Sequence, residues 1–158
     1  MSTRRAATGL AIFLLAAFSA GAIGSIFTAS AIPTWYAALK KPSWTPPGWV
    51  FGPVWTALYL TMGVAAWLVW RRGGWAANRT PLTLFALQLA ANALWSILFF
   101  GLHTPGAAFL EIVVLWSLIL ATALAFRRVS ALAAWLLLPY LAWVTYAATL
   151  NFGIWRLN

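Results

Sequence analysis

The segment from Trp35 to Tyr59 reads WYAALKKPSWTPPGWVFGPVWTALY and is dense in tryptophan and proline. The prolines and lysines of its first half indicate a loop, and its apolar second half indicates the start of a helix. Indole rings are rigid, with an apolar face and one N–H donor. A group of them where a loop enters a helix forms a surface suited to flat, apolar, ring-shaped molecules. We therefore expect this segment to contain the functional site.

The rest of the chain is too apolar for a water-soluble protein. Of its 158 residues, 64% are hydrophobic and 7% are charged, and the mean hydropathy is +0.88. A soluble domain contains about 25% charged residues. The composition therefore predicts an integral membrane protein with the lipid bilayer as its surroundings.

Five apolar runs are long enough to cross a membrane as helices, since a spanning helix needs about 20 residues. They cover residues of about 10–32, 50–70, 81–101, 107–126 and 132–150. Arg, Lys, Pro or Gly residues bound each run, and the connections are short. The sequence thus predicts an all-α bundle of five transmembrane helices that forms one domain over residues 1–158.

The basic residues lie at the ends of these runs, which makes them signals of topology. In a five-span arrangement one side of the membrane has Arg4, Arg5, Arg71, Arg72, Arg79, Arg127 and Arg128, and the other has Lys40, Lys41 and Arg156. The net charge of +9 therefore does not indicate a nucleic-acid partner. The unequal division predicts a cytoplasmic amino terminus in a bacterial cell membrane, with the tryptophan–proline loop facing outward.

The first run begins like a signal peptide, because Arg4 and Arg5 precede it and Ala20-Gly21-Ala22 resembles a cleavage site. The uncharged stretch continues to Thr34, much further than the apolar core of a signal peptide. We therefore expect a retained first helix that ends at Pro33.

Other residues predict how the helices pack and begin. Gly21, Gly24 and Ser25 on the first helix permit close contact with a neighbouring helix. Thr45 is expected to cap the second helix. Pro53 either kinks that helix or marks its true start.

Three helices have a face on which aromatic and polar residues recur at helical spacing. These faces are Phe51, Trp55, Leu58, Tyr59 and Met62 on the second helix; Gln88, Asn92, Trp95, Ser96 and Phe99 on the third; and Pro139, Trp143, Tyr146, Ala147 and Leu150 on the fifth. Amides inside a membrane must find partners. Gln88 and Asn92 either hold helices together by hydrogen bonds or line an apolar pocket and orient a ligand.

The twelve tryptophans divide by their depth in the spans. Those near span ends are expected to anchor the protein at the membrane surfaces, and they are Trp35, Trp67, Trp70, Trp75 and Trp155. Those on the inner faces are candidates for ligand contact, and they are Trp55, Trp95 and Trp143.

Few residues are available for catalysis or metal binding. Glu111 is the only acid, His103 is the only histidine, and cysteine is absent. A carboxylate pair for acid–base catalysis and thiolate metal sites are therefore excluded. His103 is expected to be a solvated loop residue, with haem ligation as the alternative. Glu111 is expected to be a structural charge, with an intramembrane function as the alternative. We expect no required metal or cofactor.

Ordered blocks of this sequence resemble the TspO/MBR family, whose members are also called translocator proteins, tryptophan-rich sensory proteins and peripheral-type benzodiazepine receptors. The matching blocks are residues 35–36 (WY), 41–47 (KPSWTPP), 54–59 (VWTALY), 88–95 (QLAANALW), 99–101 (FFG), 139–143 (PYLAW) and 148–152 (ATLNF). They occur in order across nearly the whole chain after residue 30.

The resemblance implies a five-helix bundle, often dimeric, with a cavity covered by the first loop. It implies binding of porphyrins such as protoporphyrin IX and haem, and of synthetic benzodiazepine-type ligands. It further implies, for some bacterial members, degradation of protoporphyrin in light. By position, Trp55 and Trp143 match the tryptophans linked to binding and to this photochemistry, Gln88 and Asn92 match the polar pocket wall, and Ala147 matches a small residue beside the ligand.

The same resemblance assigns the lid and completes the set of candidates. The ligand-binding candidates are Trp44, Pro46, Pro47, Phe51, Trp55, Tyr59, Gln88, Asn92, Trp95, Trp143, Tyr146, Ala147 and Leu150, the first three of which match the lid. A sterol-recognition pattern is only partly present, because Leu150 and Arg156 fit it but Phe152 stands where the strict pattern has Tyr.

We expect a membrane receptor or sensor that binds porphyrin or haem as its ligand and buffers, moves or signals their level. One alternative is a protein that degrades porphyrin with light and oxygen, with Trp55 and Trp143 as the reactive residues. A porphyrin or lipophile transporter is a second alternative, which the absence of internal repeats disfavours. Small residues such as Ala86 and Ala90 predict a homodimer formed through the third helix.

Overall fold

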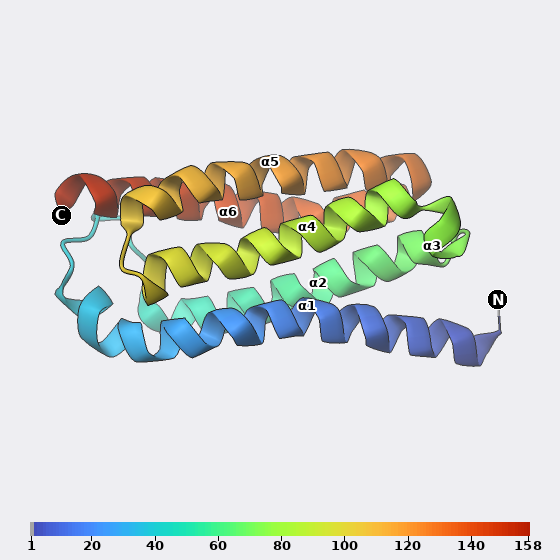
Figure 1. The fold of residues 1–158 in the computed structure, drawn as a ribbon, viewed down its shortest axis with the longest axis horizontal. Coiled ribbons are helices and arrows are strands. Elements are labelled where there is room, and N and C mark those ends of the chain that lie inside the picture. The colour runs from blue at the N-terminus through green and yellow to red at the C-terminus, as the bar shows by residue number, and fades with distance from the viewer. Residues whose placement is uncertain (1) are drawn as a thin grey trace.

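Lipid offers no hydrogen-bond partner to the backbone, so each apolar run has to satisfy its own peptide groups as a helix. The computed structural model describes residues 2–158, and within that range its secondary structure elements are all helices joined by short loops (Figure 1). The main helices are α1 (Thr3–Ala31), α2 (Phe51–Trp70), α4 (Arg79–Ser96), α5 (Pro105–Val129) and α6 (Ala131–Leu157). Shorter pieces are η1 (Ile32–Tyr36), η2 (Gly48–Val50), α3 (Gly74–Ala77) and η3 (Ile97–Gly101).

Five continuous helical segments of 23 to 34 residues are long and apolar enough to cross a membrane. They lie side by side along one axis, and the two termini lie at opposite ends of the bundle (Figure 1). Five crossings require this separation of the termini. The predicted fold class, an all-α, multi-pass integral membrane bundle of five helices, is confirmed.

The first span is longer than predicted, and Pro33 does not end it. The span runs from Thr3 to Tyr36 instead of residues 10–32. Around Pro33 the helix widens into the π-helical turn η1, which accommodates a residue without an N–H. The Thr34 hydroxyl donates to the Ser30 carbonyl at 2.7 Å and satisfies one of the acceptors there. The helix therefore passes the proline with its polar groups bonded.

The prediction that Thr45 caps the second helix is wrong. Its hydroxyl donates to the Pro42 carbonyl at 2.8 Å and its amide donates to the same oxygen at 3.1 Å, so Thr45 closes a turn within the loop. The helix begins later, with η2 at Gly48 and α2 at Phe51. Pro53 is the third residue of α2, where no intrahelical donor is needed, so it marks the start of the helix.

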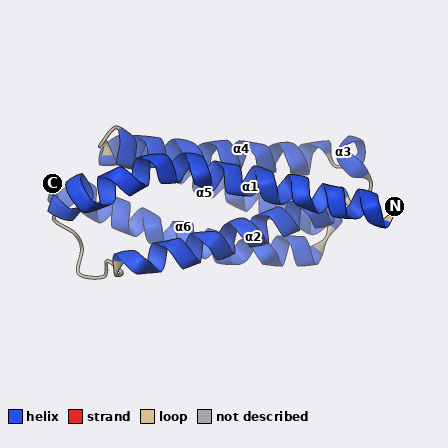
Figure 2. Cartoon of the chain, turned by 90° about the horizontal axis from the view of Figure 1, so that it is seen from below, coloured by secondary structure: helices blue, strands red, loops and turns tan. Residues whose placement is uncertain are grey.

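Helices α1 and α2 pack closely in the half of the bundle near the amino terminus. A Cβ atom at Gly63 would lie 3.0 Å from Leu14 Cα and 3.1 Å from the Phe13 carbonyl oxygen, so only glycine permits this approach. Near the same end the Trp67 indole N–H donates to the Ala6 carbonyl at 2.8 Å. The two helices separate towards the other end (Figure 2). This divergence makes room for a cavity.

Candidate ligand-binding site

A cavity of about 650 Å³ lies in the half of the bundle away from the amino terminus, next to the loop that joins η1 to η2. Its lining comes from α1, η1, η2, α2, α4, η3 and α6, so every span except α5 contributes. Nine of the 24 lining residues are aromatic. The aromatic lining residues are Phe18, Tyr36, Phe51, Trp55, Tyr59, Trp95, Phe99, Phe100 and Trp143.

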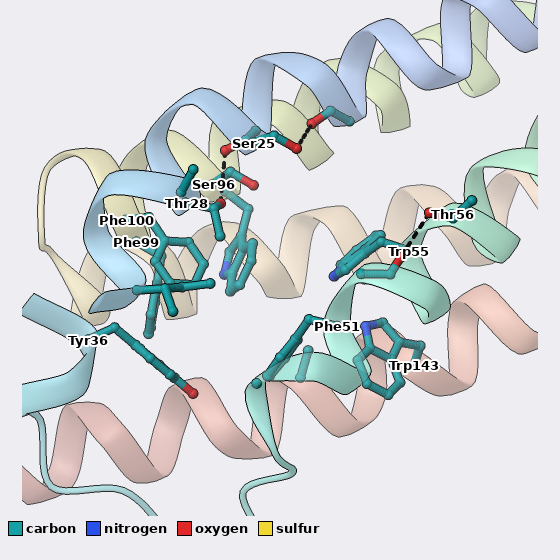
Figure 3. A pocket seen from close by; sticks show the side chains of 18 of the residues that line it. Ser25, Thr28, Tyr36, Phe51, Trp55, Thr56, Ser96, Phe99, Phe100 and Trp143 are labelled. Carbon is teal, nitrogen blue, oxygen red and sulfur yellow. Dashed lines mark hydrogen bonds between the residues drawn. The ribbon is translucent and has the colours of Figure 1, made fainter. Parts of the chain in front are cut away.

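One aromatic wall combines α2 and α6. The Trp55 and Tyr59 rings are stacked with centroids 5.5 Å apart and planes 26° apart. Phe51 meets the Trp143 ring edge-on at 6.0 Å. Trp55, Phe51 and Trp143 gather at one end of the cavity (Figure 3). Spacing along α2 places Phe51, Trp55 and Tyr59 on a common face, as the sequence predicted.

The facing wall combines η1, α4 and η3. The Trp95 and Phe99 rings are stacked at 5.3 Å and 22°, and Tyr36 packs against Phe99 at 6.3 Å and Phe100 at 5.7 Å. The rings of Tyr36, Phe99 and Phe100 lie across the cavity from the first wall (Figure 3). The Trp95 indole N–H is already used, because it donates to the Asn151 side-chain oxygen at 3.0 Å. Trp95 thus offers a ligand its ring face.

The third side of the cavity is formed by α1, which the sequence analysis did not assign to the site. Its lining residues are Phe18, Gly21, Ala22, Gly24, Ser25, Thr28, Ala29 and Ile32. The predicted close packing is also present, because side chains at Gly21 and Gly24 would overlap the Tyr59 ring and the Ser96 hydroxyl. Gly21, Gly24 and Ser25, from which the sequence analysis predicted only close packing, could therefore also have indicated that α1 lines the cavity.

The hydroxyl groups on α1 are bonded within the helix. Ser25 donates to the Gly21 carbonyl at 2.9 Å, and Thr28 donates to the Gly24 carbonyl at 2.8 Å. With their protons engaged, these oxygens face the cavity as acceptors. Ala22, Ser25 and Ala29 on α1 are solvent-accessible in the isolated chain, as are Gly52 and Thr56 on α2. The cavity is therefore open between α1 and α2.

Gln88 and Asn92 do not line the cavity; both are buried behind its wall, with exposed fractions of 1% and 2%. The Tyr59 hydroxyl donates to the Asn92 side-chain oxygen at 2.7 Å, and the Asn92 amide donates to the Tyr140 hydroxyl at 3.0 Å. Asn92 thus joins α4 to α2 and α6. The sequence left open whether Asn92 holds helices together or lines a pocket. In the structure it forms hydrogen bonds between helices. Its influence on the cavity passes through Tyr59.

The loop residues Trp44, Pro46 and Pro47 also lie outside the lining. The loop is tied to α6, since the Tyr146 hydroxyl donates to the Trp44 carbonyl at 2.5 Å. A second tie joins Lys40 to Asn158, whose side chain accepts from the Lys40 amide at 3.0 Å and donates to the Lys40 carbonyl at 2.9 Å. The loop is thereby held over the end of the bundle near the cavity.

Of the remaining candidates on α6, some line the cavity and one does not. Ala147 and Leu150 line the cavity, whereas Tyr146 touches the loop instead. Asn151 lines the cavity as well and was not among the predicted site residues. Its amide donates to the Pro105 carbonyl at 2.7 Å while its oxygen holds Trp95, so it fixes one wall from α6.

No charged side chain lines the cavity. The Lys41 ammonium lies 4.9 Å from the centroid of the lining residue Tyr36 and donates to the Leu39 carbonyl at 3.0 Å. The His103 ring is stacked on Trp35 at 4.3 Å, outside the lining. Within residues 2–158, no three side chains of the metal-ligating types His, Cys, Asp and Glu cluster. The lining therefore offers aromatic ring faces and no charged side chain.

The same sequence features recur in known proteins. The family model described as TspO/MBR family matches residues 12–156. The tryptophan-rich protein TspO of Archaeoglobus fulgidus is 45% identical over 92% of this chain and 94% of its own length. The translocator protein of Homo sapiens is 45% identical over 86% of this chain and 82% of its own. The protein CrtK of Rhodobacter capsulatus is 41% identical over 96% and 93%, respectively. Together with the five-helix fold and its tryptophan-lined cavity, these matches show that the chain belongs to the TspO/MBR family.

Proposed function

We propose that this protein is a membrane receptor or sensor that binds a porphyrin, such as protoporphyrin IX or haem, in the cavity between its helices. In this role it regulates the level or movement of the ligand. The observation that supports the proposal most directly is the pair of facing aromatic walls (Figure 3), with Phe51, Trp55 and Trp143 on one side and Phe99 and Phe100 on the other. A flat macrocycle inserted between them is stacked on both faces.

The size and polarity of the cavity also favour such a ligand. Its volume of about 650 Å³ lies within the range of roughly 300 to 1,000 Å³ that is typical of small-molecule sites. Since no charged side chain lines it, the ring of a porphyrin fits its interior and the carboxylates of the propionates do not. We propose that these carboxylates point to the loop end, where Lys41 lies beside Tyr36.

The test is a titration of the purified protein with protoporphyrin IX in detergent, in the dark. Binding is followed both by tryptophan fluorescence and by the visible absorption of the porphyrin. We expect saturable binding that Trp143→Phe weakens roughly three- to tenfold, because a stacked aromatic contact contributes about 0.5 to 1.5 kcal/mol. Trp135→Phe is the matched control, since Trp135 is 68% exposed on α6 and lies outside the cavity.

Two outcomes oppose the proposal. Quenching that rises without saturation means that the porphyrin only partitions into the micelle. Equal affinities of the Trp143→Phe and Trp135→Phe variants mean that the porphyrin binds elsewhere on the protein.

A second candidate function is degradation of the bound porphyrin with light and dioxygen. It is favoured by the position of Trp55 and Trp143, which both line the cavity beside Phe51. The light-excited porphyrin would pass its energy to dioxygen, and the activated dioxygen would add to a double bond of the macrocycle. In an alternative route, an indole of this wall would give one electron to the excited ring, and the ring would pass it to dioxygen as superoxide. The oxidised indole would then regain an electron from the porphyrin, whose radical cation would combine with the superoxide. No acid–base pair is needed.

Product formed per bound porphyrin distinguishes this function from binding alone. If the tryptophans act chemically, Trp55→Phe and Trp143→Phe lower the yield in light at equal occupancy. An unaltered yield at equal occupancy assigns the degradation to the porphyrin and light alone.

We further propose that the amino terminus lies in the cytoplasm and that the protein forms homodimers. The proposed dimer surface contains Ala86 and Ala90, which are both exposed on α4. Small exposed residues on a spanning helix allow close approach of a second helix.

A further inference from the structure

A second cavity, of about 320 Å³, lies at the other end of the bundle from the aromatic cavity. It is a groove between α1 and α4, closed at its end by Trp70 of α2 and Trp75 of α3. All of its lining residues are Gly, Ala, Ile, Leu, Phe or Trp. Trp75, at 49% exposure, and the exposed Ala86 show that the groove opens outward, towards the lipid.

The floor of the groove is firmly packed. A side chain at Gly9 would overlap the Trp70 ring, so the glycine allows the indole to lie against α1. Phe13 packs against Trp70 at 6.1 Å and against Phe85 at 6.2 Å. Phe13 and Phe85 are buried. The groove is therefore a fixed hollow in the surface that faces the bilayer.

Two arginines stand where the groove reaches the end of the bundle. The Arg5 guanidinium lies 5.8 Å from the centroid of the Trp70 ring, and Arg5 precedes Gly9 by about one helical turn. Arg79 precedes the lining residue Leu82 by about one turn of α4. Both arginines are exposed. The only acid of the chain, Glu111, is near the start of α5 at the opposite end of the bundle.

We propose that this groove binds one anionic phospholipid, with an acyl chain between α1 and α4 and the phosphate at Arg5 and Arg79. The apolar lining matches a hydrocarbon chain, and the pair of cations matches a negative headgroup at the membrane surface. Basic residues beside grooves between spanning helices are suited to such headgroups. This site is separate from the aromatic cavity and does not depend on the function proposed for it.

Charge favours a lipid over a second copy of the chain in this groove. Two copies inserted in the same orientation place Arg5 and Arg79 of both at the same depth in the membrane. Their approach would bring positive charges together, with no acid at that end to compensate. An anionic lipid neutralises the same arginines. Since Ala86 lines the groove and Ala90 does not, a bound lipid and a partner helix would exclude each other at Ala86, and the proposed dimer contact would then be left to Ala90.

The test is native mass spectrometry of the detergent-solubilised protein, titrated separately with dioleoyl phosphatidylglycerol and dioleoyl phosphatidylcholine. We expect one tightly bound phosphatidylglycerol, preferred over phosphatidylcholine by roughly thirtyfold, since each of the two basic contacts at the surface contributes about 1 kcal/mol. The Arg5→Gln/Arg79→Gln variant should lose this preference. Arg127→Gln/Arg128→Gln, which removes equal charge from α5 outside the groove, should keep it.

A second pair of variants tests the apolar part. Ala86→Phe fills the groove from an exposed position and should weaken the binding of both lipids equally. Ala142→Phe, at an exposed position of α6 outside both cavities, should leave binding unaltered. Circular dichroism confirms that each variant keeps its helical content.

Two results would overturn the proposal. One is an equal loss of phosphatidylglycerol preference in the two arginine variants, which would indicate general surface charge. The other is that Ala86→Phe leaves lipid binding unaltered but shifts the ratio of monomer to dimer, which would make the groove an interface between copies of the chain.

Discussion

At the scale of single residues, Asn92 is the polar contact that links the core to the cavity. It accepts from Tyr59 and donates to Tyr140, so one amide satisfies two buried phenols from different helices. Asn92→Leu should lower the thermal midpoint of unfolding in detergent, because losing a buried partner costs about 1 to 3 kcal/mol. It should also weaken porphyrin binding, because Tyr59 loses its anchor.

The control for Asn92→Leu is Thr145→Val. Thr145 accepts from the Trp116 indole at 2.8 Å and joins α5 to α6 outside the cavity. That variant should lower the midpoint and leave the affinity for porphyrin unaltered. If Asn92→Leu likewise lowers the midpoint and leaves the affinity for porphyrin unaltered, the amide does not position the cavity wall.

Lys41 is a second single residue with a testable role. It lies beside Tyr36, which lines the cavity, and no charged side chain belongs to the lining itself. Lys41→Gln should weaken binding of protoporphyrin IX by several-fold, since the cation no longer meets the propionate carboxylates. Binding of the dimethyl ester, which has no free carboxylate, should not change. A titration of both ligands in the dark measures the difference. Equal effects on the two ligands would remove Lys41 from the site.

At the scale of secondary structure elements, the contact between α1 and α2 decides how wide the cavity opens. Gly63→Leu should separate these helices, because even a Cβ atom at Gly63 lies 3.0 Å from Leu14 Cα. Overpacking of this kind costs about 1 to 3 kcal/mol, so the thermal midpoint should fall. Gly52→Ala on the same helix meets nothing within 4 Å and should retain the wild-type midpoint. Equal midpoints for Gly63→Leu and wild type would show that the two helices can separate freely.

The loop between η1 and η2 is the other element that decides access, and α6 holds it. Tyr146→Phe removes the hydrogen bond to the Trp44 carbonyl while keeping the ring. The loop should then be cut faster by trypsin after Lys40, since the bond between Lys41 and Pro42 resists trypsin, and bound porphyrin should dissociate faster. Thr149→Ala, which removes a hydroxyl bonded within α6, is the control. Unchanged proteolysis of Tyr146→Phe would mean that the other contacts suffice to hold the loop.

At the scale of the whole molecule, the division of basic residues predicts orientation. The chain has no cysteine, so single-cysteine variants report on the two sides without any background. In intact bacteria a membrane-impermeant maleimide should label Ser43→Cys in the loop, which the proposed topology places on the outer side. It should label Ala76→Cys in α3 only after the cells are permeabilised. The reverse pattern would invert the proposed topology.

Much of the architecture was predictable because membrane insertion depends on composition and length, which are local properties. Five apolar runs gave five spans, although their ends differed: Pro33 lies within the first span and Thr45 lies in a loop turn. These ends depend on hydrogen bonds to other turns, which no local pattern specifies. Aromatic spacing on α2 placed Phe51, Trp55 and Tyr59 together, since helical periodicity is also local.

The sequence by itself determined the membrane environment, the number of spans and the face of α2 that turns inward, because hydropathy and helical periodicity are properties of the local sequence. On α6 the prediction held for Trp143, Ala147 and Leu150, but Pro139 is exposed. The tertiary structure decided which inward residues reach the cavity. It placed Asn92 and Gln88 behind the wall and brought α1 to the third side. It also set the divergence of α1 from α2, through the missing side chain of Gly63. These outcomes depend on how side chains of different helices fill space against one another, and that relation exists only once the helices are packed.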